Sequence, residues 1–380
     1  MDAESLKKSN EIIERVEQVL QATYEGAIAF NLAFNGDKPI KIPSPRLADG
    51  YQLEASEILF WVDRSAYFEE YEAWQQSSTQ EIHQGAIDQL KANGQTGEFH
   101  DLVSAIKRNR IAPFIGAGVS YSCGYPMWAA ALHELSHKID GVDLSAFGAK
   151  MAAYEYLGAA QLLWDKDEIQ VKNFIRTKFD EQPIRTNGIK GPIKLLASFS
   201  RGCIITTNFD HLIELTLGPT QIDGYMHGNQ QGHMFVPRLI SGDRCILKLH
   251  GDSANYNTFV FTENQYTESY GVPLDFAKPL PKALRQIFVS HSLLFLGCSL
   301  EQDRTLELFQ KICDDKQFDI PDHFAILPLP ADNSSKIVKE SRLLKLNIRP
   351  LWYSPFNNHE LVEKYLALAV DMADGRIAPF

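Results

Sequence analysis

The sequence lacks paired cysteines, long apolar runs and an excess of basic residues. Its five cysteines are isolated, with no Cys-x-x-Cys pair, so neither a zinc ribbon nor a secreted disulfide framework is indicated. The first twenty residues are polar and periodic, unlike a signal peptide, and no uncharged apolar run approaches membrane-spanning length. We therefore expect a cytoplasmic protein with reduced thiols and no membrane attachment.

The charge balance of the chain argues against a protein that binds nucleic acid through a broad basic surface. The chain of 380 residues carries 37 basic and 48 acidic side chains, a net charge of −11. This balance argues against a broad electrostatic attraction to nucleic acid, so direct nucleic-acid binding is not expected. With 44% hydrophobic residues, the chain is long enough for one large domain and an appendage.

Residues 1–95 are predicted to form a separate N-terminal α+β appendage. Residues 1–22 have helical spacing, turn signals interrupt the next segment, and "KANGQTGE" at 91–98 resembles a linker. Aromatic residues among acidic ones in "FWVDRSAYFEEYEAW" indicate either a small packed subdomain or a docking surface. We expect this appendage to mediate oligomerisation or contact a partner.

The rest of the chain, residues 96–380, alternates strands with helices. This alternation predicts an α/β fold with a doubly wound, Rossmann-like, mainly parallel sheet, and a helical insertion at about 141–200. The expected strands are 111–115, 203–207, 245–249, 257–261, 292–297, 323–328 and 348–352. In such a sheet, ligands bind at the carboxyl ends of the strands.

Glycines and a serine follow the first of these strands, in "IAPFIGAGVSYSCGYPMW". Gly116 and Gly118, on either side of Ala117, let backbone amides approach an anion, and Ser120 adds a hydroxyl group. The segment suits a nucleotide pyrophosphate. Gly-Ala-Gly after a strand also marks simple tight turns, so both interpretations stay open.

Three further strands end in polar residues. Thr206-Thr207-Asn208-Phe209-Asp210 follows the second strand, although Asn208 and Asp210 could equally cap the next helix. His250 lies in "KLHGD", where Gly251 leaves access to an imidazole that can accept a proton near neutral pH. Gly297 and Ser299 follow a later strand, where Asp303 is expected to begin a helix.

These four blocks, in this order, resemble the sirtuin superfamily over roughly residues 99–312. The chain departs from deacylase sirtuins because it lacks their four-cysteine zinc module and keeps only the Gly and Pro of their Gly-Ile-Pro-Asp-Phe-Arg loop, so peptide deacylation is not indicated. The Thr-Thr-Asn-Phe-Asp variant, the Pro-x-Trp and "VFTENQY" instead resemble the bacterial sirtuin-like NAD hydrolases of anti-phage defence.

This resemblance implies an NAD+ glycohydrolase that cleaves the nicotinamide–ribose bond and depletes cellular NAD, with no metal. Asn208 and His250 would be catalytic. The residues implied in NAD binding are Gly116, Ala117, Gly118, Ser120, Thr207, Asp210, Gly297 and Ser299. It also implies a homo-oligomer that works beside a second protein, such as a HerA-like ATPase or a short Argonaute.

Two rival functions can be weighed on the sequence. A protein of this fold could bind NAD or ADP-ribose as a sensor without turnover, although a pure binder needs neither a base nor an oriented amide. "HELSH" at 133–137 matches the zinc metalloprotease motif H-E-x-x-H. The apolar face of that helix lies opposite its histidines, which argues against a zinc site.

Overall fold

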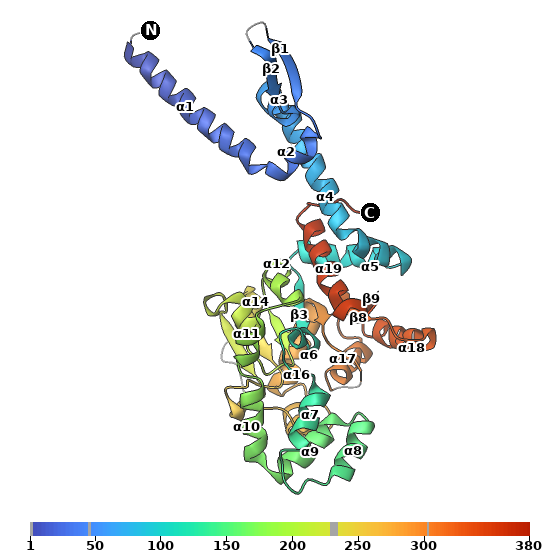
Figure 1. The fold of residues 1–380 in the computed structure, drawn as a ribbon. Helices are drawn as coiled ribbons and strands as arrows, with labels where there is room; N and C mark the ends of the chain where they lie inside the picture. Colours follow the sequence, from blue (N-terminus) through green and yellow to red (C-terminus); the bar gives the residue numbers. More distant parts are fainter. Residues whose placement is uncertain (1–2, 45–46, 229–234, 302–303) are drawn as a thin grey trace. The chain divides into compact units, whose positions relative to one another are not determined.

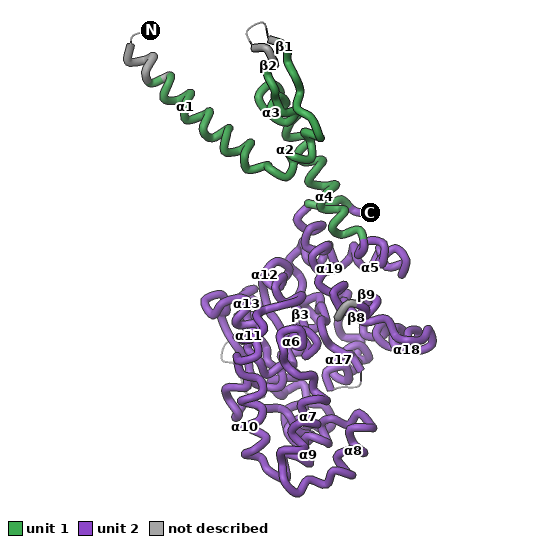
Figure 2. Tube along the Cα trace, in the orientation of Figure 1, with its two compact units in different colours: residues 1–84, 376–378 green, residues 85–375, 379–380 purple. Residues whose placement is uncertain are grey.

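The computed structural model describes residues 3–44, 47–228, 235–301 and 304–380. The chain forms two compact units, one of residues 1–84 with 376–378 and one of residues 85–375 with 379–380 (Figure 2). The division falls within helix α4 (Arg64–Ala92), whereas the sequence analysis places the boundary at residue 95. Within the described ranges, no helix has the length and apolar character needed to cross a bilayer.

The N-terminal unit is built around an aromatic core. It contains α1 (Ala3–Gly26), α2 (Ile28–Asn35), the antiparallel strands β1 (Ile40–Ser44) and β2 (Leu47–Leu53), α3 (Ala55–Val62) and most of α4. The rings of Phe60 and Tyr67 pack edge to face with centroids 4.9 Å apart, and the Tyr67 hydroxyl donates to Asn31 Oδ1 at 2.6 Å. The aromatic segment therefore forms the core of a small packed subdomain, which was one of the two interpretations left open.

The larger unit contains a sheet of seven parallel strands in the order β5-β6-β4-β3-β7-β8-β9 (Figure 1). The strands are β3 (Ile111–Ile115), β4 (Ile204–Thr206), β5 (Gly224–His227), β6 (Cys245–Lys248), β7 (Ser292–Leu296), β8 (His323–Pro328) and β9 (Ile348–Tyr353). The chain adds strands first on one side of β3 and then on the other, as in a doubly wound sheet. The predicted α/β class is confirmed.

Helices cover the sheet on both faces. On one face Phe114, Ile205 and Leu247 belong to a large core cluster with residues of α16 (Pro279–Ser290) and α17 (Arg304–Asp315). The alternate residues Ile204 and Ile246 point to the opposite face and are also fully buried. Burial on both faces explains why these strands read as continuous apolar runs in the sequence.

The remaining helices precede, connect or follow the strands of this sheet, and several of them lie between residues 144 and 199, where the sequence analysis predicts a helical insertion. In chain order they are α5 (Thr96–Lys107), α6 (Ala117–Tyr121), α7 (Trp128–Ser136), α8 (Leu144–Ala152), α9 (Tyr156–Lys166), α10 (Glu168–Lys178), α11 (Gln182–Asn187), α12 (Leu196–Phe199), α13 (Leu212–Leu217), α14 (Phe235–Ser241), α15 (Glu263–Tyr270), α18 (Asn333–Leu344) and α19 (Phe356–Ala373).

The strand predicted at 257–261 is wrong. Residues Tyr256–Thr258 form a 3-10 turn, and the segment after it is bound to a loop instead of joining the sheet, since the Val260 amide donates to the His250 carbonyl at 3.0 Å. Its apolar residues are buried over that loop, which gives them the composition of a strand. The sequence analysis also missed β5, a short strand at the edge of the sheet next to β6.

Candidate functional site

The four strands that carry the sequence motifs are neighbours in the sheet, in the order β6-β4-β3-β7. All are parallel, so their carboxyl ends lie at one edge. Gly116 follows β3, Thr207 follows β4, His250 lies just beyond β6 and Gly297 follows β7. The topology therefore gathers blocks that are up to 180 residues apart in the sequence at one place.

The glycines join two of these strand ends through backbone contacts. The Gly118 amide donates to the Gly297 carbonyl at 3.0 Å, and a Cβ at Gly116 would lie 2.5 Å from that same oxygen. Gly297 has a φ of +65°, and a Cβ there would lie 2.4 Å from the Val119 nitrogen. These positions require glycine for close packing. Gly118 is exposed and Ala117 half-exposed, so this part of the loop can face a ligand.

Asn208 is buried and its amide is fixed in orientation. The amide nitrogen donates to the Gly116 carbonyl at 3.1 Å and to Ser120 Oγ at 2.9 Å. Both of its hydrogens are thereby used, and the side-chain oxygen remains as the hydrogen-bonding atom that can hold a water or a hydroxyl group. Ser120 is 2% exposed, and it acts here as a positioning residue for Asn208.

Asp210 joins the same network from the other side of Ser120. Burial raises the pKa of Asp210, while the charge of Lys248 and hydrogen bonds from the Leu212 amide and Ser120 act in the opposite direction. Its Oδ1 accepts from the Leu212 amide at 3.0 Å, at the first residue of α13. Asp210 therefore supports the helix start, as a capping residue would, and contacts the site through Ser120.

His250 is enclosed by aromatic rings, with the centroids of Trp128 and Phe209 at 6.1 and 6.2 Å. Its Nε2 is hydrogen-bonded to the hydroxyl of Tyr266, and its ring is also hydrogen-bonded to the backbone of Thr207. Burial lowers the pKa of His250 to about 4. The imidazole is therefore neutral at physiological pH, and it is a weaker base than the ordinary value of about 6.5 suggests.

Thr207 connects the two predicted catalytic residues. Its backbone bonds to the His250 ring, and it directly precedes Asn208 in the chain. The amide and the imidazole thus belong to one local structure. Gly297 and Ser299 lie on the loop after β7, where Ser299 is exposed and its carbonyl accepts from Lys339 Nζ at 2.7 Å. Asp303 lies outside the described residues.

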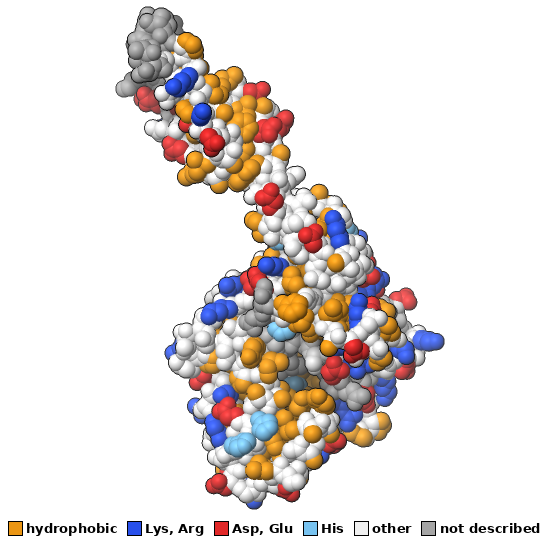
Figure 3. All heavy atoms as spheres, turned by 45° about the vertical axis from the view of Figure 1, so that its right-hand side comes forward, with side chains coloured by type: hydrophobic (Ala, Val, Ile, Leu, Met, Phe, Trp, Pro, Cys, Tyr) orange, Lys and Arg blue, Asp and Glu red, His pale blue; other side chains and the backbone are white. Residues whose placement is uncertain are grey.

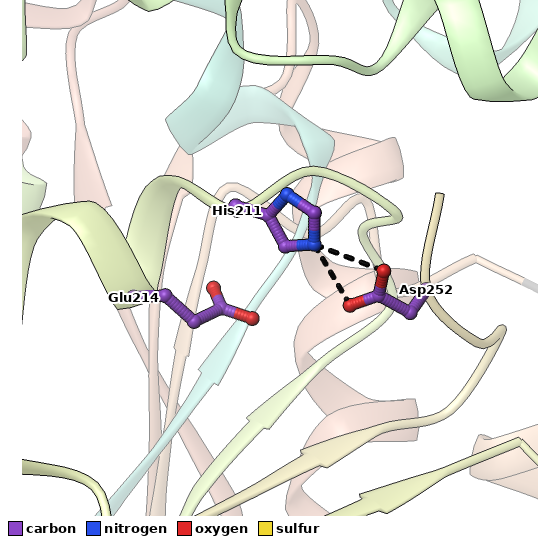
Figure 4. A group of neighbouring side chains, drawn as sticks. All are labelled: His211, Glu214 and Asp252. Carbon is purple, nitrogen blue, oxygen red and sulfur yellow. Dashed lines mark hydrogen bonds and ion pairs between the residues drawn. The ribbon is translucent and has the colours of Figure 1, made fainter. Parts of the chain in front are cut away.

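A buried charge network, which sequence reasoning missed, adjoins this site. His211 Nε2 lies 2.9 Å from Asp252 Oδ1, and the imidazole is turned toward that carboxylate with Glu214 nearby (Figure 4). Lys248, at 0% exposure, donates to Asp252 Oδ2 and to Glu214 Oε1, each at 2.9 Å, and to the Asp210 carbonyl at 2.8 Å. The one feature of the sequence that could have indicated this network is Lys248, which ends the otherwise apolar strand β6.

The pKa shifts show how this network is held together. The hydrogen bond with Asp252 raises the pKa of His211. Burial works against ionisation of Asp252, but the bond to His211 and the charge of Lys248 together lower its pKa. Burial also works against the charge of Lys248, yet its two carboxylate partners raise its pKa. The network therefore contains a charged lysine compensated by acidic groups.

Part of this network has side chains of the types that bind metal ions, placed close together. Ligand atoms of His211, Glu214 and Asp252 lie within 4.8 Å of one another. However, the Lys248 ammonium already bonds to both carboxylates, so it supplies the positive charge that a metal would bring. We interpret the cluster as an ion network.

The "HELSH" segment, residues 133–137, lies at the end of α7, and its glutamate forms ion pairs. Glu134 pairs with Lys138 at 2.9 Å and with Lys178 at 2.5 Å, and these bonds lower its pKa. His133 and His137 are exposed, as the helical spacing predicts. Because its glutamate is held by two lysines, the segment does not have the free carboxylate that activates water in a metalloprotease.

Comparison with known proteins finds similarity to one domain family and to several named relatives. Residues 202–351 match the SIR2-like domain family. Over 270 residues, 68% of this chain and 54% of the relative, the chain is 24% identical to NAD(+) hydrolase ThsA of Bacillus cereus (strain MSX-D12). It is 30% identical over 204 residues to NAD(+) hydrolase ThsA of Acinetobacter baumannii (strain 532279), covering 52% and 38% of the two chains.

A third relative has a name that refers to defence. The chain is 24% identical over 277 residues, 70% of its length, to Defense-associated sirtuin 2 of Bacillus subtilis, of which the match covers 26%. The chain thus spans about half or less of the length of these curated relatives. The comparisons thus show a chain that is similar to these sirtuin-like proteins, with the match to the SIR2-like domain at residues 202–351.

Proposed function

We propose that this protein is an NAD+ hydrolase that cleaves the nicotinamide–ribose bond to give nicotinamide and ADP-ribose. The observation that carries the proposal is the placement of Asn208 and His250 at neighbouring strand ends, joined through Thr207. Similarity to proteins named NAD(+) hydrolase over more than half of the chain supports it.

The chemistry of the bond fits these side chains. Nicotinamide leaves as a neutral molecule from a cationic pyridinium, so the leaving group needs little acid catalysis. The ribosyl cation that remains must be stabilised while water is positioned on its free face. The side-chain oxygen of Asn208 would hold that water or a ribose hydroxyl, and neutral His250 would receive the proton that is released.

The loops around these two residues would bind the rest of NAD. The start of α6 at half-exposed Ala117 and exposed Gly118 would lie against the pyrophosphate, and Ser120 would keep Asn208 in its orientation. Gly297 and Ser299 would face the adenosine ribose. Thr207 and Asp210 would border the nicotinamide ribose. In this scheme no metal takes part.

The biological role would be depletion of cytoplasmic NAD during phage infection. The relatives named NAD(+) hydrolase ThsA and Defense-associated sirtuin 2 support this role. The second candidate is a sensor that binds NAD or ADP-ribose without turnover. The neutral, aromatic-enclosed His250 favours catalysis, since binding alone does not require a base that is kept unprotonated.

The proposal is tested by incubating the protein with NAD and measuring free nicotinamide. We expect release by the wild type, loss in Asn208→Ala and His250→Ala, and normal release in the exposed controls Asn257→Ala and His133→Ala. If the wild type binds NAD in calorimetry yet releases no nicotinamide, the sensor function replaces this one. Normal release by His250→Ala would contradict the assigned base.

For the N-terminal unit, we propose a role in assembly. Helix α1 carries exposed apolar side chains at Ile12, Ile13, Val16 and Val19, and hydrophobic side chains are visible on the surface of this unit (Figure 3). A homo-oligomer, or a second protein such as a HerA-like ATPase or a short Argonaute, would cover them. Light scattering of Ile13→Asp/Val16→Asp should show a smaller assembly than the wild type. This role would be contradicted if the variant kept the mass of the wild-type assembly and also kept wild-type NAD turnover in the presence of such a second protein.

A further inference from the structure

The hydroxyl of Tyr266 is hydrogen-bonded to His250 Nε2. Tyr266 lies in α15, and its side chain is 7% exposed. Its ring centroid lies 5.5 Å from that of His250, at an interplanar angle of 61°. A tyrosine that contacts the proposed base is a candidate for a chemical role in the reaction.

The start of α15 is fixed by a complete capping box. Thr262 accepts from the Gln265 amide at 3.3 Å, while Gln265 Oε1 accepts from the Thr262 amide at 3.1 Å and from the Phe261 amide at 2.8 Å. The next turn is also packed, since the rings of Tyr266 and Tyr270 stack with centroids 5.5 Å apart. The phenol of Tyr266 is thus held in place by its own helix.

Both nitrogens of His250 are therefore engaged. Nε2 is bonded to Tyr266, so the bond to the Thr207 backbone falls to Nδ1, and because this bond raises the pKa of His250, we infer that Nδ1 carries a proton and donates it to the Thr207 carbonyl. In the neutral imidazole the lone pair then lies on Nε2, and it accepts from the Tyr266 hydroxyl. A substrate proton can reach the ring only through one of these two partners. The Thr207 carbonyl has no proton to pass on, so the path leads through Tyr266.

We propose that Tyr266 is a catalytic residue that relays the substrate proton to His250. As the water or ribose hydroxyl loses its proton to the Tyr266 oxygen, the original phenol proton moves to His250 Nε2. One substrate O–H bond and one tyrosine O–H bond break, while a new tyrosine O–H bond and an N–H bond form. Tyr266 is neutral before and after, and the positive charge ends on His250. This inference rests on the proposed NAD hydrolysis.

The surroundings of His250 suit such a relay. The rings packed on it come from Trp128, Phe209 and Tyr266, and of these groups only the phenol can titrate. A neutral tyrosine can pass a proton without becoming a phenolate, which this apolar environment would disfavour. The relay therefore needs no charged intermediate on Tyr266.

The test compares Tyr266→Phe with Tyr270→Phe, which removes a phenol hydroxyl from the stacked neighbour on the same helix. We expect kcat for nicotinamide release to fall by about 100-fold or more in Tyr266→Phe with little change in KM, and both to stay near wild type in Tyr270→Phe. We also expect a proton inventory, in which wild-type kcat is measured in mixtures of light and heavy water, to fit a step in which two protons move. If Tyr266→Phe matches or exceeds the wild type, the substrate displaces Tyr266 and His250 acts directly, which overturns the relay.

A measurement on the wild type covers the case in which Tyr266→Phe does not fold. Nitrogen NMR of the imidazole near neutral pH should show His250 protonated on Nδ1 and unprotonated on Nε2. A proton on Nε2 would mean that His250 donates to the phenol, and it would reverse the proposed path. If the wild-type protein binds NAD but releases no nicotinamide, the proposed hydrolase function is wrong, and the relay, which rests on that function, is wrong as well.

Discussion

Asn208 Nδ2 donates to Ser120 Oγ at 2.9 Å, and Ser120 is in turn hydrogen-bonded to the carboxylate of Asp210. Asn208, which the sequence analysis predicts to be catalytic, and Ser120 and Asp210, which it predicts to bind NAD, thus form one chain of contacts. Because Ser120 is 2% exposed, we expect it to affect the proposed reaction through the orientation of Asn208.

Ser120→Ala should therefore impair turnover more than NAD binding. The substitution removes one acceptor of the Asn208 amide and a donor to Asp210, so the amide can rotate away from its working position. We expect kcat to fall about 10-fold with a smaller change in KM. Steady-state nicotinamide release measures both. Ser122→Ala is the control, because the Ser122 hydroxyl donates to the Val119 and Lys190 carbonyls. A rise in KM at constant kcat would instead indicate direct contact with the substrate.

The activity should persist at acidic pH. Since burial lowers the pKa of His250 to about 4 in the protein without NAD, the neutral base is present down to about that pH, and the acid limb of kcat/KM should lie near it. An acid limb near pH 6.5 would show that the imidazole is solvated. The profile must be recorded only where the protein stays folded, as followed by circular dichroism.

The same shift affects stability. A histidine whose folded pKa lies below its unfolded value of about 6.5 favours folding fully above that value, and its contribution is lost as the pH falls toward about 4. The loss amounts to about 3 kcal/mol at the acid end. Urea unfolding at several pH values should show a weaker acid dependence in His250→Ala than in the wild type. An equal dependence would contradict the buried, neutral imidazole.

The topology of the large unit could be predicted because its strands are buried on both faces. Burial produces apolar runs that end in glycine or polar residues, and strand β3 is found at the predicted residues. Edge strand β5 could not be found in this way, since it is short and its residues are partly exposed. The segment 257–261 has a strand's composition because packing over a loop buries the same residue types as a sheet does.

The site was only partly predictable for a different reason. Asn208 and His250 could be predicted as candidates because each closely follows a strand, which places it at one edge of the sheet. Tyr266 lies on a helix and His211 on a loop, and no spacing rule relates their contacts with His250 and Asp252 to a strand end. The burial of Lys248 could not be predicted because a lysine is usually exposed, although four acceptors surround its ammonium group in the fold.

Gly297→Ala should disrupt the contact between the segment that follows β3 and the loop that follows β7. The substitution places a Cβ about 2.4 Å from the Val119 nitrogen at a φ of +65°. Gly188→Ala is a matched control, with a φ of +72° and no atom within 4 Å of its Cβ. Both variants should lose about 1 kcal/mol for the backbone conformation, but only Gly297→Ala should also lose NAD turnover. Urea unfolding and nicotinamide release separate the two effects, and equal behaviour of both variants would show that the close contact is unimportant.

Lys248→Met should destabilise the large unit strongly. The ammonium is fully buried and bonds to Asp252 and Glu214, so its removal leaves two neighbouring carboxylates without their cation. Breaking one side of a buried ion network costs about 3–5 kcal/mol, whereas an exposed pair contributes about 0–1 kcal/mol. Lys138→Met is the control, because Lys138 pairs with Glu134 at the surface. Urea unfolding should show the large loss only for Lys248→Met.

If divalent cations restored the stability of Lys248→Met, the His211, Glu214 and Asp252 cluster would be able to bind a metal once the lysine is removed. If instead Lys248→Met were as stable as Lys138→Met, the lysine would not compensate these carboxylates.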